Sequence, residues 1–96
     1  MFPEKIKQLR EECQLPLRKL AAALDIDSAT YWKIERGERR ARKEHIPIIA
    51  KILQADFEEL LTLWLADQVT AVVADEKKLA DKVLDTAKQN LKNNKL

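Results

Sequence analysis

Residues 15–37 read LPLRKLAAALDIDSATYWKIERG, two short helical patterns separated by a tight polar turn. Apolar residues recur in the first pattern at the three- and four-residue spacing that puts them on one helix face: Leu17, Leu20, Ala21 and Leu24. Asp25 tolerates the left-handed conformation of a sharp turn, and Asp27 is a good N-cap for a second helix. That second helix would bury Tyr31 and Ile34. The pattern therefore predicts two helices joined by a three-residue turn, which is how a chain presents a helix to the major groove of DNA.

The outward face of the second helix carries the candidate base-reading side chains, Ser28, Ala29, Trp32 and Lys33. Serine bonds to several base edges, lysine favours guanine O6 and N7, and apolar groups rest on a thymine methyl. An ordinary solvated helix face is the alternative for this set. For Trp32, packing against a neighbouring chain is a second alternative.

Charge is distributed unevenly along the chain. Residues 1–43 hold 11 Lys/Arg and 7 Asp/Glu, whereas residues 44–96 hold 7 and 9. The tightest basic cluster, residues 33–43, has six basic residues against Glu35 and Glu38, and it favours a polyanionic partner. Its candidate phosphate contacts are Arg36, Arg39, Arg40, Arg42 and Lys43. Solubility alone is the alternative role for this cluster.

Composition predicts an all-α fold. The 96 residues are 46% hydrophobic with one glycine and three prolines, which fits one small helical domain, or such a domain plus an extension. A single cysteine excludes an intrachain disulfide and a cysteine-based metal cage. No apolar run resembles a signal peptide or reaches membrane-spanning length, so we expect a cytoplasmic protein without membrane contact.

Six helices and no strands are expected. Their approximate ranges are residues 3–14, 16–24, 28–36, 43–53 and 56–74, with a last helix that opens near Asp75 and frays towards Asn93-Asn94-Lys95. Gly37 is suited to the end of the third helix. Pro47 implies that the fourth helix either begins late, near His45, or is bent. Asp56 begins a capping-box pattern at the fifth helix.

The segment from Ile6 to Leu61 resembles the lambda-repressor and Cro type of helix-turn-helix domain, often called the XRE family. The matching positions are Leu9-Arg10, Leu20-Ala21, Leu24, Ile26, Thr30, Ile34-Glu35, Arg36-Gly37, Ile49-Ala50-Lys51, Leu53 and Glu59-Leu60-Leu61. The resemblance implies a five-helix DNA-binding domain and a transcription factor that binds operators as a dimer. The ending LTLWLADQ resembles a subgroup of small bacterial regulators in which a long C-terminal extension follows this domain.

Two departures from the family pattern bear on the site. Pro16-Leu17 replaces a common Ser-Gln, so the phosphate contact expected there passes to Arg18 or Lys19. The run 40–42, Arg-Ala-Arg, replaces a common Asn-Pro-Ser, which loses a cap and adds charge. The resemblance also implies a buried ion pair between Arg10 and Glu35, with two unrelated surface charges as the alternative.

The fifth helix is apolar on nearly every side, and a helix of that kind must be covered all round. We expect residues 1–66 to form the DNA-binding domain and residues 67–96 an extension that dimerises. The last helix would cover one side of the fifth helix, and a second copy would cover another. The expected dimer interface is Leu61, Trp64, Leu65, Val69, Val72 and Val73. An extension that folds back to complete a monomeric core is the alternative.

The remaining reactive side chains suggest no chemistry. Tyr31 is first a core residue, with a hydroxyl that could extend to a phosphate, while Cys13 and His45 are incidental. No second histidine, cysteine or carboxylate cluster indicates a metal, a cofactor or a catalytic centre, so we do not expect an enzyme. The sequence predicts a homodimeric transcriptional regulator that binds an inverted-repeat operator in double-stranded DNA. The alternative is a protein-interaction module, antitoxin-like or an adaptor subunit, that works through its C-terminal helices.

Overall fold

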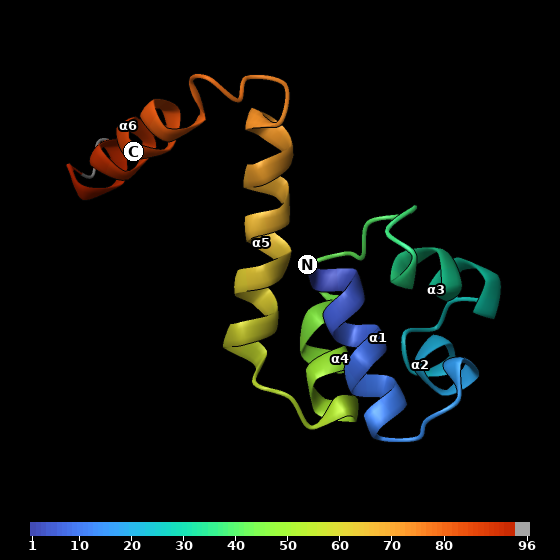
Figure 1. Cartoon of the computed structure of the whole chain (residues 1–96). Coiled ribbons are helices and arrows are strands. Elements are labelled where there is room, and N and C mark those ends of the chain that lie inside the picture. The colour runs from blue at the N-terminus through green and yellow to red at the C-terminus, as the bar shows by residue number, and fades with distance from the viewer. Residues whose placement is uncertain (94–96) are drawn as a thin grey trace. The chain divides into compact units, whose positions relative to one another are not determined.

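The computed structural model describes residues 1–93, and within them the chain is all-helical, as expected, with six α-helices and no strand (Figure 1). The helices are α1 (Phe2–Glu12), α2 (Leu17–Ala23), α3 (Ser28–Glu35), α4 (His45–Leu53), α5 (Phe57–Val73) and α6 (Ala80–Lys92). The chain divides into two compact units, Met1–Leu65 and Ala66–Leu96. The division falls within α5.

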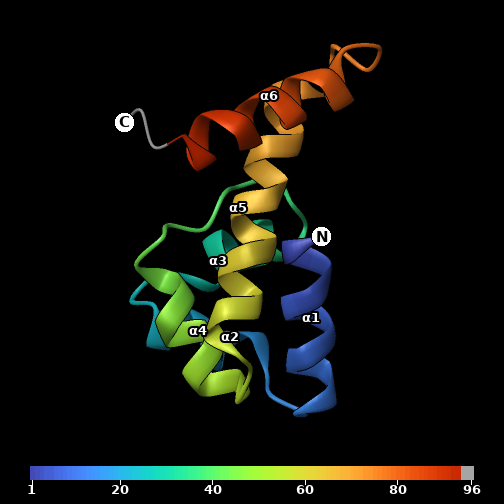
Figure 2. The ribbon, with the colours of Figure 1, turned by 90° about the vertical axis from the view of Figure 1, so that its left-hand side faces the viewer.

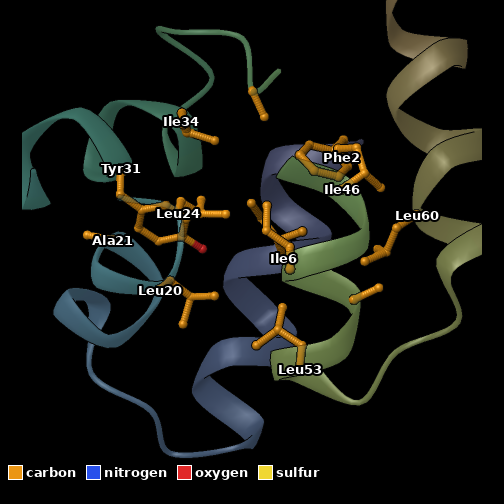
Figure 3. Packing of buried hydrophobic residues seen from close by; sticks show 13 residues of the cluster. Phe2, Ile6, Leu20, Ala21, Leu24, Tyr31, Ile34, Ile46, Leu53 and Leu60 are labelled. Atoms are coloured by element: carbon orange, nitrogen blue, oxygen red, sulfur yellow. The ribbon is translucent and has the colours of Figure 1, made fainter. Parts of the chain in front are cut away.

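One hydrophobic core holds the first unit together (Figure 3). Each of α1 to α4 and the first turn of α5 places a fully buried side chain in it: Ile6, Leu20, Tyr31, Ile46, Ile49 and Leu60. α1 packs against α3 and α4, and α2 packs against the same two helices. Burying each aliphatic side chain stabilises the fold by about 1.5–3 kcal/mol. The side of α3 that faces α1 and α2 therefore lies in the core. Figures 1 and 2 show the ribbon of these helices in two views.

Four helices end in the same way, with a left-handed residue after the last turn. These residues are Gln14, Asp25, Gly37 and Gln54, with φ values of 57°, 58°, 77° and 53°. After α2, the Asp25 N–H donates to Ala22 O and the Ile26 N–H donates to Ala21 O, which is the Schellman pairing. Ile26 then packs on the core. The prediction of a left-handed Asp25 is confirmed, and the α2–α3 turn is held rigidly by its own backbone.

Pro47 causes no break in α4 because the helix begins late, at His45. The proline is then the third helical residue, where its missing N–H is one that the first turn leaves unbonded in any helix. Of the two interpretations of Pro47, the late start is confirmed. At the next helix, Asp56 accepts from the Glu58 N–H at 3.1 Å and caps α5.

The last helix begins five residues later than expected, at Ala80 rather than near Asp75. In between, the N–H groups of Glu76 and Leu79 donate to carbonyls three residues back, which closes turns instead of an α-helix. None of the thirteen residues of α6 is buried. The expectation that this helix covers one side of the fifth helix is therefore wrong for the part of α5 that belongs to the second unit. The apolar α6 side chains Val83, Leu84 and Leu91 are exposed, and so is the N-cap residue Leu79. The end of the expected polar tail, Asn94-Lys95, lies outside the described residues.

No described helix has the length and apolar character needed to cross a membrane.

Tyr31 is fully buried, so its hydroxyl does not reach a phosphate. Among the described residues, this hydroxyl is the one buried side-chain polar atom without a hydrogen-bond partner. Burial and the nearby Glu35 carboxylate raise the Tyr31 pKa far above its ordinary value. Removing an unpartnered buried hydroxyl costs little or stabilises. We therefore expect Tyr31→Phe to leave the free energy of unfolding at pH 7 unchanged or raised.

The same burial predicts alkaline unfolding. In the unfolded chain a tyrosine ionises near pH 10. Because the folded pKa is raised, the stability that the neutral phenol contributes is complete below pH 10 and falls above it by up to about 1.4 kcal/mol per pH unit. Tyr31 is the only tyrosine, so phenolate absorbance reports this residue alone. Absorbance should rise only as helical circular dichroism is lost. Ionisation near pH 10 with the helices intact would contradict this prediction.

Candidate nucleic-acid interface

α3 is fixed at its start by Asp27. Its Oδ1 accepts from the Thr30 N–H at 2.6 Å, which satisfies one of the free donors of the first turn. This bond, with the positive charges of Lys33 and Arg39, lowers the Asp27 pKa. The carboxylate therefore stays charged at the positive end of the helix dipole. The predicted N-cap is confirmed, and it sets where the exposed face of α3 begins.

The two faces of α3 differ sharply. Tyr31, Ile34 and Glu35 are buried on one face. The other face is exposed and carries all four of the expected base-reading residues: Ser28, Ala29, Trp32 and Lys33. Trp32 is the large apolar side chain of this face, and 46% of its surface is exposed. The fold thus leaves this face of α3 open to solvent.

Arg36 lies over this face rather than pointing away from it. Its guanidinium is 4.5 Å from the centre of the Trp32 ring, and its Nε is 2.8 Å from Glu38 Oε2. Stacking and the ion pair both favour this position of the arginine. Because Glu38 offsets part of its charge, Arg36 is less available to a phosphate than its exposure alone suggests.

A loop without helix or strand, residues 36–44, connects α3 to α4 and is called the basic loop below. Its cationic side chains are all exposed: Arg36, Arg39, Arg40, Arg42 and Lys43. Arg39, Arg40 and Arg42 line one hollow of about 330 Å³, with Thr30 and Ile34 of α3 among the other lining residues. The structure therefore brings three of the expected phosphate contacts together beside α3.

Two of the expected phosphate contacts lie outside the basic loop: Arg18 and Lys19, in the first turn of α2. Both side chains are exposed. Pro16 occupies the N-cap and offers no side-chain hydrogen bond to that turn. Arg18 and Lys19 therefore place two exposed cations at the start of α2, where no side chain caps the helix.

Arg10 and Glu35 meet inside the first unit. Arg10 Nε and Nη2 donate to the two carboxylate oxygens of Glu35 at 2.8 and 3.0 Å, while Nη1 donates to Leu15 O at 2.9 Å. The Glu35 carboxylate raises the pKa of Arg10. The pair joins α1 to α3. It also hides the Glu35 charge, so the exposed side chains of residues 33–43 carry six positive charges and one negative charge.

Sequence reasoning missed two residues that hold the basic loop. His45 Nδ1 accepts from the Arg42 N–H at 3.4 Å, although the histidine was expected to be incidental. Trp64 Nε1 donates to Ala41 O at 2.9 Å. The sequence did not indicate that Trp64 contacts the basic loop, because this residue lies in a helix that is apolar on every side.

The expected dimer residues divide into two groups. Leu61 and Trp64 are partly buried against the core of their own unit, and Val73 is 8% exposed. Leu65, Val69 and Val72 are exposed, by 44%, 49% and 79%. Their four- and three-residue spacing places these three on one face of α5.

The described residues hold no group of three or more histidine, cysteine, aspartate or glutamate side chains that could bind a metal ion.

Comparison with known proteins matches the chain to a protein-family model. Residues 4–63 fit the family model of the helix-turn-helix domain, which covers well over half of the chain. Neither the curated proteins nor the solved structures include a significant match.

Proposed function

The chain belongs to the helix-turn-helix domain family, and we propose that it is a sequence-specific transcriptional regulator. Membership in this family suggests DNA binding and a regulator-type role. The protein binds double-stranded DNA with α3 in the major groove. Ser28, Ala29, Trp32 and Lys33 read base edges, and the cations of the basic loop, with Arg18 and Lys19, contact phosphates. Regulators of this class act by occupying an operator rather than by catalysis.

The observation that carries the proposal is the position of the charge. The open face of α3 ends at a loop whose five cations are all exposed, while the one acid within α3 is buried against Arg10. A helix that reads the groove needs both an open face and nearby cations, because base contacts supply the specificity and phosphate contacts supply most of the affinity.

Binding to a labelled duplex of random sequence, measured over a salt series, tests the proposal. Neutralising several phosphates gives a log–log slope of roughly −0.9 per contact, so affinity should fall steeply between about 50 and 200 mM salt. Retention on heparin should fall in parallel. An absence of duplex binding at low salt would contradict the proposed function.

We further propose that the first unit is of the lambda-repressor and Cro type and that the residues after 66 are a dimerising extension. Leu65, Val69 and Val72 support this, because they leave one face of α5 apolar and exposed. A two-fold dimer is the commonest symmetric assembly and would present two α3 helices to successive major grooves, about 34 Å apart. The operator is then an inverted repeat.

Single charges placed on α5 test the dimer. Val69→Asp and Val72→Asp would bury an unpaired carboxylate in the interface, which dissociates the dimer. Thr70→Asp adds the same charge to an exposed neighbour on another face and should leave the assembly intact. Sedimentation at micromolar concentration compares the three. A wild-type monomer that binds a single, non-repeated site would contradict this prediction.

The exposed apolar face of α6 favours a second candidate, a protein-interaction module acting through the C-terminal helices. Leu79, Val83, Leu84 and Leu91 would then meet a different protein. The two functions separate on the salt series, because a module of this kind needs no duplex binding.

A further inference from the structure

The basic loop has a single buried side chain among the described residues 36–44. Ala41 is 3% exposed, and Arg40 and Arg42 on either side of it are exposed. Residues 40–42 form neither helix nor turn. With Ala41 held in the core, Arg40 and Arg42 on either side of it lie at the surface.

The hydrogen bond that holds Ala41 comes from α5. Trp64 packs against the core cluster that contains Ala41, and its indole Nε1–H donates to Ala41 O at 2.9 Å. A partly buried indole N–H that loses its partner costs free energy, so the bond favours one position of the loop. His45 Nδ1 fixes the adjacent Arg42 N–H. The middle of the loop is thus held at two consecutive backbone groups.

From this geometry we propose that Trp64 is a positioning residue for DNA binding: its hydrogen bond to Ala41 O holds Arg40 and Arg42 ready for the phosphates. This inference rests on the proposed function and deepens it. A loop that is already ordered loses less conformational entropy when it binds, so its affinity for DNA is higher. The hydrogen bond also links the basic loop to α5, the helix on which the dimer surface is proposed.

Trp64→Phe tests the proposal because it keeps an aromatic ring and removes the donor. We expect duplex affinity to fall roughly three- to tenfold, the range of one net hydrogen bond. The loss should be equal for all sequences, and the salt slope should become shallower, because the affected contacts are to phosphate. Combined with Arg40→Ala, the loss should be less than additive. Unchanged affinity and slope would overturn the proposal.

Thr62→Val is the matched control. It removes one hydrogen bond from the same helix, Thr62 Oγ1 to Glu58 O at 2.7 Å, without touching the basic loop. Its duplex affinity and salt slope should equal those of the wild type. A loss like that of Trp64→Phe would show that any weakening of α5 suffices, and it would overturn the positioning role.

Hydrogen exchange of the two indole N–H groups gives a second measurement, on the wild-type chain. The Trp64 proton should exchange more slowly than that of Trp32, which is 46% exposed. If the anchored loop binds DNA better, then DNA must favour the anchored loop by the same factor. A random duplex should therefore slow Trp64 exchange further. Exchange unaffected by bound duplex would overturn the proposal.

Failure of the positioning role can be told apart from failure of the proposed function. A wild-type chain that binds duplex while Trp64→Phe binds equally well rejects the positioning role alone. A wild-type chain that binds no duplex rejects both.

Discussion

Arg10→Met should destabilise the fold by about 3–5 kcal/mol. The Glu35 side chain is 3% exposed and keeps both carboxylate oxygens on Arg10, so the variant leaves a buried negative charge with no partner. The Leu15 carbonyl loses its donor as well. Domains of this size are stable by only about 5–15 kcal/mol, so much of the total would be lost. Urea unfolding followed by circular dichroism measures the change.

A double-mutant cycle separates the pair from its surroundings. Glu35→Gln removes the charge, and in its presence Arg10→Met should cost much less than in the wild type. Small, additive effects would show that the two residues contribute independently.

The chain offers a matched control on the surface. Arg36 Nε and Glu38 Oε2 are also 2.8 Å apart, but these side chains are 54% and 46% exposed. Because water screens an exposed pair, Arg36→Met should change the free energy of unfolding by no more than about 1 kcal/mol. An equal loss at both pairs would mean that burial is not the cause.

Lys33→Ala and Arg40→Ala should both weaken DNA binding, but in different ways. Lys33 lies on the open face of α3, so its loss should cost about 1–3 kcal/mol and relax the preference at one base position. Arg40 lies in the basic loop, so its loss should weaken binding to all sequences alike and make the salt slope shallower by roughly one unit. Titrations against the preferred site and its point variants, over a salt series, separate the two.

Neither residue belongs to the buried core, so both variants should unfold at the wild-type urea concentration, which serves as the control. A uniform loss from Lys33→Ala would contradict its base-reading role. A loss confined to one base position in Arg40→Ala would contradict its phosphate role.

The sequence predicted the first unit well because its signals are local. Apolar spacing in α2, the Asp27 cap and the Gly37 turn each depend on neighbours a few residues away. The left-handed residues Gln14 and Gln54 were missed, because glutamine seldom marks such a turn. A detectable signal was the apolar residue that follows each one, Leu15 and Ala55, which packs on the core.

The C-terminal extension was harder to predict because the apolar residues of α5 are not confined to one side of the helix. Apolar residues all round α5 predict burial without saying which partner covers each face. Trp64 was therefore assigned to a second copy, whereas it packs on its own unit and bonds to Ala41. The late start of α6 also lacked a signal, since residues 75–79 contain no proline or glycine.

Selection of bound sequences from a random pool of duplex DNA tests most directly whether α3 reads a specific site. The full chain should enrich one motif arranged as an inverted repeat, with half-site centres about one helical turn apart. The same selection with Lys33→Ala should lose the preference at one position in each half. A pool that stays random after repeated rounds, although the protein is folded, would contradict sequence-specific recognition by this helix.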